Sequence, residues 1–201
     1  HLRQLYADEG GLPTGLARLV ERFQLAGLTT LQTRLQWPPA TNLNVPMVGR
    51  AEEMQHLRQA RQKGGHAIIY GEPGAGKTRL AYELYRQQES TSRLILLDCQ
   101  ENEQSLPYQA LISSLRQCVQ ADEWQSLAEG WRSQLAILLP ELSALFPDLQ
   151  QLHPANPLEA SSQVYEAIYQ LFKLLSQKHA LLFILEDVQW CDGASLLVLD
   201  D

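Results

Sequence analysis

The sequence predicts an α/β fold in which a parallel sheet lies between layers of helices. Short apolar runs typical of buried strands alternate with stretches whose leucines recur at helical spacing. One apolar run leads into a glycine-rich loop, and another ends in two adjacent carboxylates. Strands that alternate with helices in this way form parallel sheets with right-handed crossovers, so we expect a three-layer core.

The glycine-rich loop spans residues 71–78 and reads Gly-Glu-Pro-Gly-Ala-Gly-Lys-Thr, a complete match to the phosphate-binding pattern G-x-x-x-x-G-K-[ST]. The apolar run at residues 67–70 predicts a buried strand before the loop, and residues 79–88 carry apolar side chains at helical spacing after it. The alternative, a glycine-rich turn that matches by chance, is disfavoured by these flanking patterns. We therefore predict a nucleotide-binding loop at the start of a helix.

The residue types of the loop suit a bound phosphate. Its glycines let the backbone adopt conformations that a β-carbon disfavours, so several N–H groups can point at an anion at the N-terminus of a helix. Lys77 would reach the β- and γ-phosphates, and the Thr78 hydroxyl would bind Mg²⁺. We expect ATP or ADP with Mg²⁺ as ligands, and the following nucleotide-binding residues in the loop: Gly71, Glu72, Pro73, Gly74, Ala75, Gly76, Lys77, Thr78 and Arg79.

The second feature is the apolar run 181–185, which is followed by Glu186 and Asp187. Such runs are typical of strands buried on both faces, and ligands of open α/β sheets bind at the carboxyl ends of the strands. This signal is weak alone and gains its meaning from the complete phosphate loop. Read as a Walker B segment, it predicts that Glu186 holds the magnesium through water, together with Thr78. Asp187 would orient or deprotonate the attacking water, which makes Asp187 and Lys77 the expected catalytic residues.

The composition is that of an ordinary globular protein of 201 residues, 45% hydrophobic and 19% charged. No apolar stretch approaches the roughly 18 to 20 residues of a membrane helix, and the N-terminus lacks the basic and apolar regions of a signal peptide. We therefore expect a cytoplasmic location and no membrane partner. The net charge of −7 argues against nucleic-acid binding by the overall field, so DNA contact is expected outside this segment.

The three cysteines, Cys99, Cys118 and Cys191, are odd in number and show no C-x-x-C spacing. This pattern predicts neither a disulfide framework nor a zinc site, and we interpret the cysteines as reduced structural thiols. His66 is expected to end the turn after Gly64 and Gly65, and His153 and His179 lie in polar contexts without metal-like spacing. The sequence therefore offers no candidate for a transition-metal site.

The chain divides into three parts. Residues 1–36 place leucines at helical intervals and predict a short helical segment, and the prolines of residues 37–46 predict an extended linker. Residues 47–201 would form the ATPase core. The chain starts at His1 and stops soon after the second acidic motif, so we expect a fragment of a longer protein, truncated after Walker B. We expect slow or undetectable turnover, because no arginine finger or sensor residue can be assigned to stabilise transition-state charge.

Residues 48–53 form a V-G-R-x-x-E box ahead of the phosphate loop. This box resembles the entry to the nucleotide pocket in the AAA-like and STAND (signal-transduction ATPases with numerous domains) proteins. The resemblance implies that Val48, Gly49 and Arg50 contact the adenine and ribose side of the nucleotide. The alternative is that Arg50 only caps its helix or pairs with Glu53.

Residues 186–196 read Glu-Asp-Val-Gln-Trp-Cys-Asp-Gly-Ala-Ser-Leu. They are similar to the signature E/D-D-x-[HQ]-W-x-D-x-x-S-L of ATPase domains in large LuxR-type and SARP-type bacterial transcriptional regulators, and in some class III nucleotidyl cyclases and kinases. Cys191 stands where that branch usually has alanine. Within the signature we expect Trp190 to be a packing residue and Asp192 to cap a helix that begins near Gly193.

Further segments resemble the same branch. A second strand, a proline-tyrosine helix start and a proline-broken helical insert are expected at residues 94–99, 107–111 and 138–149. Residues 1–36 resemble, without a diagnostic motif, the last helices of the TPR-like domain that precedes the ATPase in SARP-type regulators. A plain helical extension of the ATPase is the alternative for that segment.

The resemblance implies an ATP- or ADP-binding STAND-type module that acts as a nucleotide-dependent switch in a multidomain bacterial transcriptional regulator. DNA binding through a domain outside this segment, and self-association in the active state, would follow. Two alternatives stay open. One is the regulatory ATPase of a signalling enzyme such as a nucleotidyl cyclase or kinase. The other is a replication-initiator-type ATPase, which the Q-W-x-D-x-x-S stretch disfavours.

Overall fold

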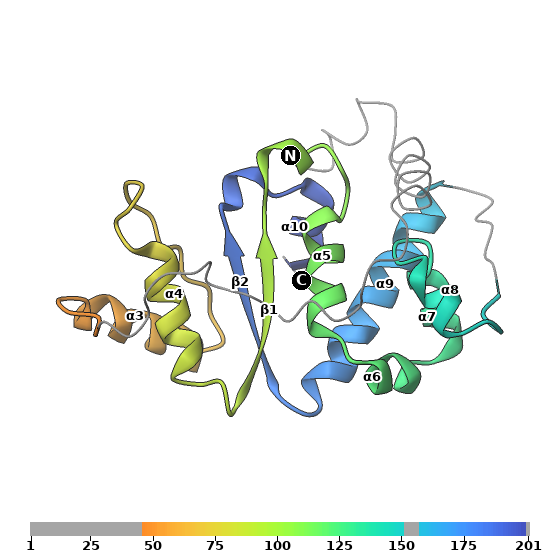
Figure 1. Ribbon diagram of the computed structural model, residues 1–201, viewed down its shortest axis with the longest axis horizontal. Helices are drawn as coiled ribbons and strands as arrows, with labels where there is room; N and C mark the ends of the chain where they lie inside the picture. The colour runs from red at the N-terminus through yellow and green to blue at the C-terminus, as the bar shows by residue number, and fades with distance from the viewer. Residues whose placement is uncertain (1–45, 151–156, 200–201) are drawn as a thin grey trace.

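The computed structural model describes residues 46–150 and 157–199 (Figure 1). The predicted helical segment 1–36 and all but the last residue of the predicted linker 37–46 lie outside this part of the chain. The described elements, in chain order, are α3 (Ala51–Gln62), α4 (Lys77–Arg86), β1 (Ser92–Asp98), η1 (Glu101–Glu103), α5 (Gln109–Cys118), α6 (Ala121–Ser126), α7 (Glu129–Leu135), α8 (Glu141–Leu145), α9 (Pro157–Ser176), β2 (Ala180–Glu186), η2 (Val188–Trp190) and α10 (Gly193–Leu199).

Two parallel strands form the sheet of the described part of the chain. They pair residue by residue, from Ser92 opposite Ala180 to Asp98 opposite Glu186. Both strands confirm the predictions made from their apolar runs. Because the strands end in register, Asp98 and Glu186 stand side by side at the same carboxyl edge.

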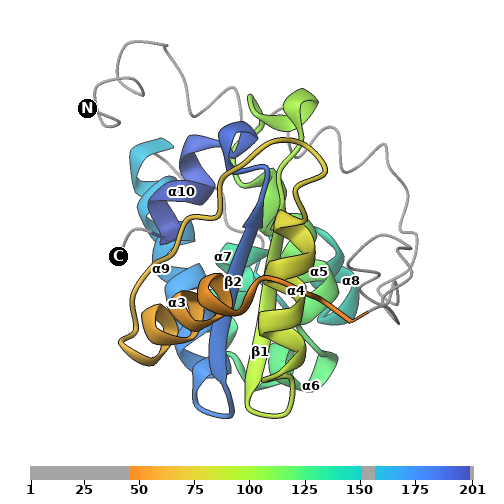
Figure 2. The same cartoon turned by 90° about the vertical axis from the view of Figure 1, so that its left-hand side faces the viewer.

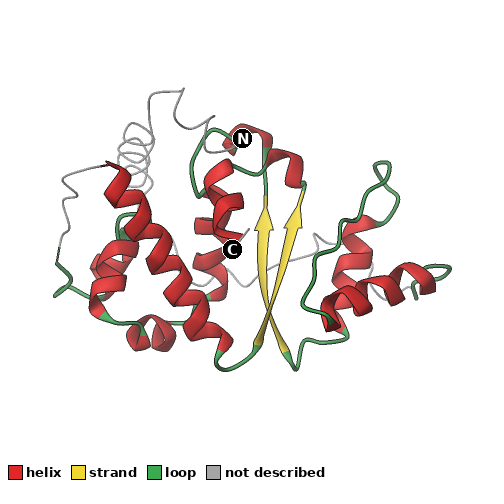
Figure 3. Ribbon diagram, turned by 180° about the vertical axis from the view of Figure 1, so that it is seen from behind, coloured by secondary structure: helices red, strands yellow, loops and turns green. Residues whose placement is uncertain are grey.

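Helices lie on both sides of this sheet, with α3 and α4 on one side and α5 and α9 on the other (Figures 1 and 3). Leu94 and Leu96 of β1 pack together with Ile184 of β2 in a cluster that includes α4. The alternate residues Ile95 and Leu97 belong to the main core, which includes α5 and α9. The strands are apolar on both faces because each face meets a helix.

The main core joins α5 and α9 to the short helices between them. Leu111 and Leu115 of α5 and Ile168 and Leu171 of α9 have no exposed surface. The apolar residues that recur at helical spacing over residues 158–178 predict a long amphipathic helix, which is confirmed as α9. The predicted helix start near residue 107 is confirmed as α5. Pro140 directly precedes α8, which confirms the expected break in the helical insert.

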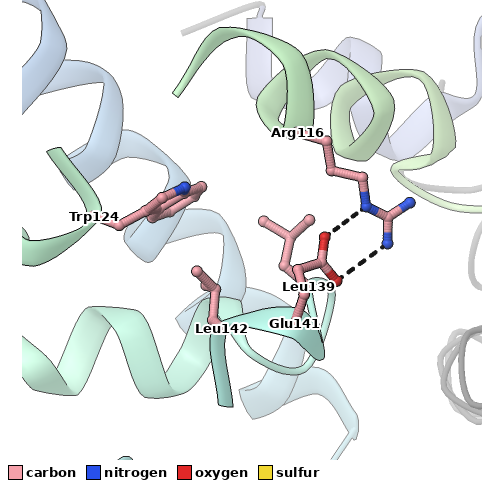
Figure 4. A pocket seen from close by; sticks show the side chains of 5 residues that line it. All are labelled: Arg116, Trp124, Leu139, Glu141 and Leu142. Carbon is pink, nitrogen blue, oxygen red and sulfur yellow. Dashed lines mark hydrogen bonds and ion pairs between the residues drawn. The ribbon is translucent and has the colours of Figure 1, made fainter. Parts of the chain in front are cut away.

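A shallow depression marks the junction of α5 with α8 (Figure 4). It is lined by Trp124, Leu139 and Leu142 beside the ion pair of Arg116 and Glu141. Arg116 Nε donates to Glu141 Oε1 at 2.6 Å, and Arg116 Nη2 donates to Glu141 Oε2 at 3.3 Å. The depression has no room for a water molecule, so it is a packed junction between helices.

The predicted strand at residues 67–70 is absent from the structure. The segment has no strand conformation, and Ile68 and Tyr70 are 84% and 90% exposed. Ile69 alone packs, against the residues around α4. The prediction was wrong because an apolar run indicates a tendency to be buried and does not supply the neighbouring strands that would pair with it on both sides.

Candidate functional site

The phosphate-loop sequence forms an exposed loop that ends in the first turn of α4 (Figure 2). Gly74 and Gly76 have φ angles of 79° and 86°, in the left-handed region where a β-carbon is strained. Gly76 directly precedes α4, so the first N–H groups of the helix, which have no acceptor within the helix, lie at the end of the loop. The helix predicted at residues 79–88 is confirmed, starting two residues earlier than expected. The combination of positive φ angles and a helix N-terminus suits an anion.

Lys77 keeps its ammonium group at the loop. Its Nζ donates to the carbonyl oxygens of Gly71 and Glu72, each at 3.1 Å. The Ala75 N–H also donates to the Glu72 carbonyl, at 3.2 Å, which closes a turn within the loop. The cation and the N–H groups of the helix N-terminus therefore lie on the same short segment, an arrangement that suits a phosphate.

The two predicted metal-binding side chains meet, although one precedes β1 and the other ends β2. Thr78 Oγ1 donates to Glu186 Oε2 at 2.6 Å. A hydroxyl and a carboxylate oxygen are the hard ligands that Mg²⁺ prefers, and Mg²⁺ takes few protein ligands because it keeps several waters. The residues that the structure describes contain no group of three or more His, Cys, Asp or Glu arranged for a metal. This donor set fits Mg²⁺.

Electrostatics at this edge favour a cation. Burial raises the pKa of Glu186, and the nearby charges of Asp187 and Asp98 raise it further, against the lowering effect of the Thr78 hydrogen bond. A divalent cation would offset these like charges. Asp98 was not predicted as part of the site. The sequence did contain a signal for Asp98, because this carboxylate ends the apolar run of β1 in the same way that Glu186 ends the apolar run of β2.

Asp187 is exposed and has a left-handed backbone, with φ 49° and ψ 47°. Aspartate tolerates this conformation better than most residues. Its Oδ1 accepts a hydrogen bond from Gln189 Nε2 at 3.2 Å, and the Gln189 carbonyl accepts one from Gln104 Nε2 at 3.3 Å. The turn that carries Asp187 is thus tied to the segment that follows β1.

Asp192 is the buried anchor of this turn, only 3% exposed. Its Oδ1 accepts from the Ser195 N–H at 2.8 Å, and its Oδ2 accepts from Ser195 Oγ at 2.7 Å, which confirms the predicted cap of α10. The same Oδ1 also accepts from the Tyr108 N–H at 2.8 Å, a contact that sequence reasoning missed. Tyr108 is buried and left-handed at φ 63°, directly before α5. Trp190 packs against the main core, which confirms its predicted role.

The V-G-R box lies against the phosphate loop. Arg50 Nη2 donates to the Ala75 carbonyl at 3.2 Å, and Arg50 Nη1 donates to Glu53 Oε1 at 2.7 Å, so the ion pair with Glu53 that was the alternative for this residue is present. Val48 is 86% exposed. Beside the box is an open cleft of about 260 Å³, lined by Met47, Gly49, Arg50, Ala51, Met54, Arg58 and Gln87.

The remaining residues from the sequence predictions are an arginine of α4, two loop residues and the histidines. Arg79 pairs with Glu83 within α4, at 2.9 Å. Glu72 and Pro73 are exposed in the loop. His66 and His179 are exposed, and His153 lies outside the described residues.

A parallel sheet flanked by helices, with a glycine-rich loop whose threonine meets the carboxylate of another strand, defines a phosphate-loop nucleotide-binding ATPase domain. The model of the AAA ATPase domain family matches residues 46–201. The chain therefore belongs to the AAA ATPase domain family. Neither a search of curated proteins nor a search of solved structures gave a match.

No helix in the described residues is both long and apolar enough to cross a membrane.

Proposed function

We propose that this domain binds ATP or ADP with Mg²⁺ and acts as a nucleotide-dependent switch. The contact between Thr78 Oγ1 and Glu186 Oε2 carries this proposal, because it brings a hydroxyl and a carboxylate from separate elements to one point beside the phosphate loop. Lys77 and the loop N–H groups bind the β- and γ-phosphates. Thr78 and Glu186 hold the magnesium, and Asp187 orients the attacking water.

The nucleoside side of the ligand is proposed to lie along the V-G-R box. Arg50 joins the box to the phosphate loop through its hydrogen bond to the Ala75 carbonyl, and Gly49 and Arg50 line the adjoining cleft. A cleft of about 260 Å³ accommodates part of a nucleoside, since small-molecule sites typically measure about 300 to 1,000 Å³. Val48, whose side chain is exposed, supplies apolar contact.

Residues 47–201 form, in this proposal, the ATPase core of a STAND-type module with a three-layer arrangement, and the segment 1–36 precedes it as a separate helical piece. The γ-phosphate and magnesium order the loops around Asp187, and their loss releases them. The domain serves a multidomain bacterial transcriptional regulator in the cytoplasm. It binds DNA through a domain outside this segment and self-associates in the active state.

The glutamine-tryptophan signature at residues 189–195 supports this context over a replication-initiator-type ATPase. A regulatory module of a nucleotidyl cyclase or kinase fits the same signature, with the ATPase assignment unchanged. The sequence of the native polypeptide on both sides of this segment, read by top-down mass spectrometry, decides between them. A helix-turn-helix or winged-helix domain supports the regulator, and a cyclase or kinase catalytic domain replaces it.

Glu186→Gln is expected to lower nucleotide affinity by about 10- to 100-fold in the presence of Mg²⁺ and to leave the affinity in EDTA unchanged, because it removes a charge that holds the metal. Isothermal titration calorimetry with ATP, with and without Mg²⁺, measures both affinities. Asp187→Asn is the matched neighbour and should retain the Mg²⁺ dependence while abolishing any turnover.

The exposed Glu89, in the turn that follows the C-terminal end of α4, supplies the second control, as Glu89→Gln. If Glu186→Gln and Glu89→Gln behave alike, the magnesium assignment is wrong. If Asp187→Asn loses the Mg²⁺ dependence instead, the metal role moves to Asp187.

A further inference from the structure

Arg50 connects the start of α3 to the phosphate loop, 25 residues further along the chain. Its two terminal nitrogens have different partners. Nη1 donates to Glu53 Oε1 at 2.7 Å, and Nη2 donates to the Ala75 carbonyl at 3.2 Å. Because the guanidinium group presents its donors in one rigid plane, the Glu53 carboxylate determines where Nη2 points.

The helix that carries this pair packs against the helix that begins at the phosphate loop. Glu53 lies in the first turn of α3, and the Met54 N–H donates to the Arg50 carbonyl at 3.1 Å. The buried contacts between α3 and α4 come from Met54, Leu57, Leu80 and Leu84. Arg50 and Glu53 therefore stand on a support that is fixed relative to the loop.

The backbone on both sides of Ala75 is free to rotate. Gly74 and Gly76 have φ angles of 79° and 86°, and a residue without a β-carbon reaches both signs of φ readily. The Ala75 carbonyl and the Gly76 N–H belong to one planar trans peptide group, in which they point in opposite directions. The bond from Arg50 to this carbonyl therefore also fixes the Gly76 N–H, which points away from Arg50.

The orientation of this peptide group matters for an anion. A carbonyl oxygen that faced a phosphate would repel it, whereas an N–H group attracts it. Lys77 holds the carbonyls of Gly71 and Glu72, but it releases them if its ammonium group turns to a phosphate. Arg50 is also bonded to Glu53 and can keep the Ala75 carbonyl while a phosphate is bound.

We propose that Arg50 and Glu53 are positioning residues that hold the phosphate loop in its anion-binding conformation. Glu53 orients the guanidinium group, the guanidinium group holds the Ala75 carbonyl, and the Gly76 N–H is kept available to a phosphate oxygen. The inference rests on the proposed function, since it takes the loop to bind phosphates. It gives Arg50 an action on the phosphate part of the ligand, in addition to its place beside the nucleoside cleft.

The test compares magnesium-ATP with magnesium tripolyphosphate, which has the phosphates and lacks the nucleoside. Arg50→Ala is expected to weaken both ligands by about 3- to 10-fold, because the loop loses a charge-assisted hydrogen bond at an exposed site. Glu53→Gln removes the charge that orients Arg50 and should weaken both by about 2- to 5-fold. Isothermal titration calorimetry measures the affinity for ATP, and competition against ATP measures that for tripolyphosphate.

Glu52→Gln is the matched control, because Glu52 is exposed and carries the same charge in the same turn of α3. It should bind both ligands as the unaltered chain does. The double variant of Arg50→Ala and Glu53→Gln should bind no more weakly than Arg50→Ala alone, because Glu53 acts through Arg50. Hydrogen exchange of the Ala75 N–H, which is bonded to the Glu72 carbonyl, needs no ligand and should be faster in both single variants.

Four results would overturn the proposal. One is an unchanged tripolyphosphate affinity in Arg50→Ala, which would confine Arg50 to the nucleoside. Another is a Glu53→Gln variant that behaves like Glu52→Gln. The third is unchanged exchange of the Ala75 N–H in both single variants, and the fourth is losses that multiply in the double variant.

Lys77→Ala separates the failure of this inference from the failure of the proposed function. If Lys77→Ala weakens ATP binding while Arg50→Ala and Glu53→Gln do not, only the positioning role is wrong. If Lys77→Ala leaves ATP binding unchanged, the phosphate loop is not the binding site, and the positioning role fails with it.

Discussion

Lys77→Ala is expected to weaken the binding of magnesium-ATP by about 10- to 100-fold, because a charge-assisted hydrogen bond contributes about 1.5 to 3 kcal/mol and each 1.4 kcal/mol changes an affinity tenfold. Stability should stay the same, since Lys77 Nζ contacts only the carbonyls of Gly71 and Glu72 on an exposed loop. Isothermal titration calorimetry gives the affinity, and thermal unfolding without nucleotide gives the stability.

The matched control for this change is Lys63→Ala. Lys63 is exposed at the end of α3 and carries the same charge without a place in the loop. Equal affinities in Lys77→Ala and Lys63→Ala would disprove the phosphate-loop assignment. A large loss of stability in Lys77→Ala would show that the loop contacts support the fold. The test of nucleotide binding would then rest on the affinities of Glu186→Gln with and without Mg²⁺.

Asp192→Ala is expected to destabilise the domain by about 3 kcal/mol, because it uncaps α10 and leaves the buried Tyr108 N–H without an acceptor. In a chain of this size that corresponds to a fall in melting temperature of about 6 to 12 °C. Urea unfolding followed by circular dichroism measures the free energy directly.

Ser195→Ala separates the side-chain contact of Asp192 with Ser195 Oγ from its two contacts with backbone N–H groups. It removes only the hydrogen bond from Ser195 Oγ to Asp192 Oδ2 and keeps both backbone contacts, so it should cost about 1 kcal/mol. Equal costs for Asp192→Ala and Ser195→Ala would mean that the contacts of Asp192 with the N–H groups of Ser195 and Tyr108 contribute nothing. The excess cost of Asp192→Ala measures these two backbone contacts together, the cap of α10 and the link to the start of α5.

Patterns within a few residues carried most of what the sequence could predict. The glycines, Lys77 and Thr78 specify the loop because their spacing along the chain is also their spacing in the site. The long helix α9 and the strand β2 followed from apolar periodicity and apolar run length. The cap at Asp192 followed from residue type alone, since aspartate accepts the N–H groups of a first helical turn.

Contacts between distant segments had no such signal. Nothing local to Tyr108 indicates that its N–H is bonded to Asp192, 84 residues further along the chain. Ile68 and Tyr70 show that a local pattern can also mislead, because both side chains are exposed. An apolar run indicates that a segment would gain free energy by burial, but whether it forms a strand depends on the strands that lie beside it.

The residue-by-residue pairing of β1 with β2 makes the domain sensitive to insertions and deletions within the strands, but not to those in surface connections. A deletion of one residue within β2 would turn Ile184 to the opposite face and draw Glu186 back from Thr78, so both packing and chemistry would fail together. The same deletion in a surface connection between the insert helices would leave the pairing intact, because loops absorb a change in length at small cost. Evolution can therefore lengthen, shorten or replace the helical insert while Asp98 and Glu186 remain paired at the carboxyl ends of the two strands.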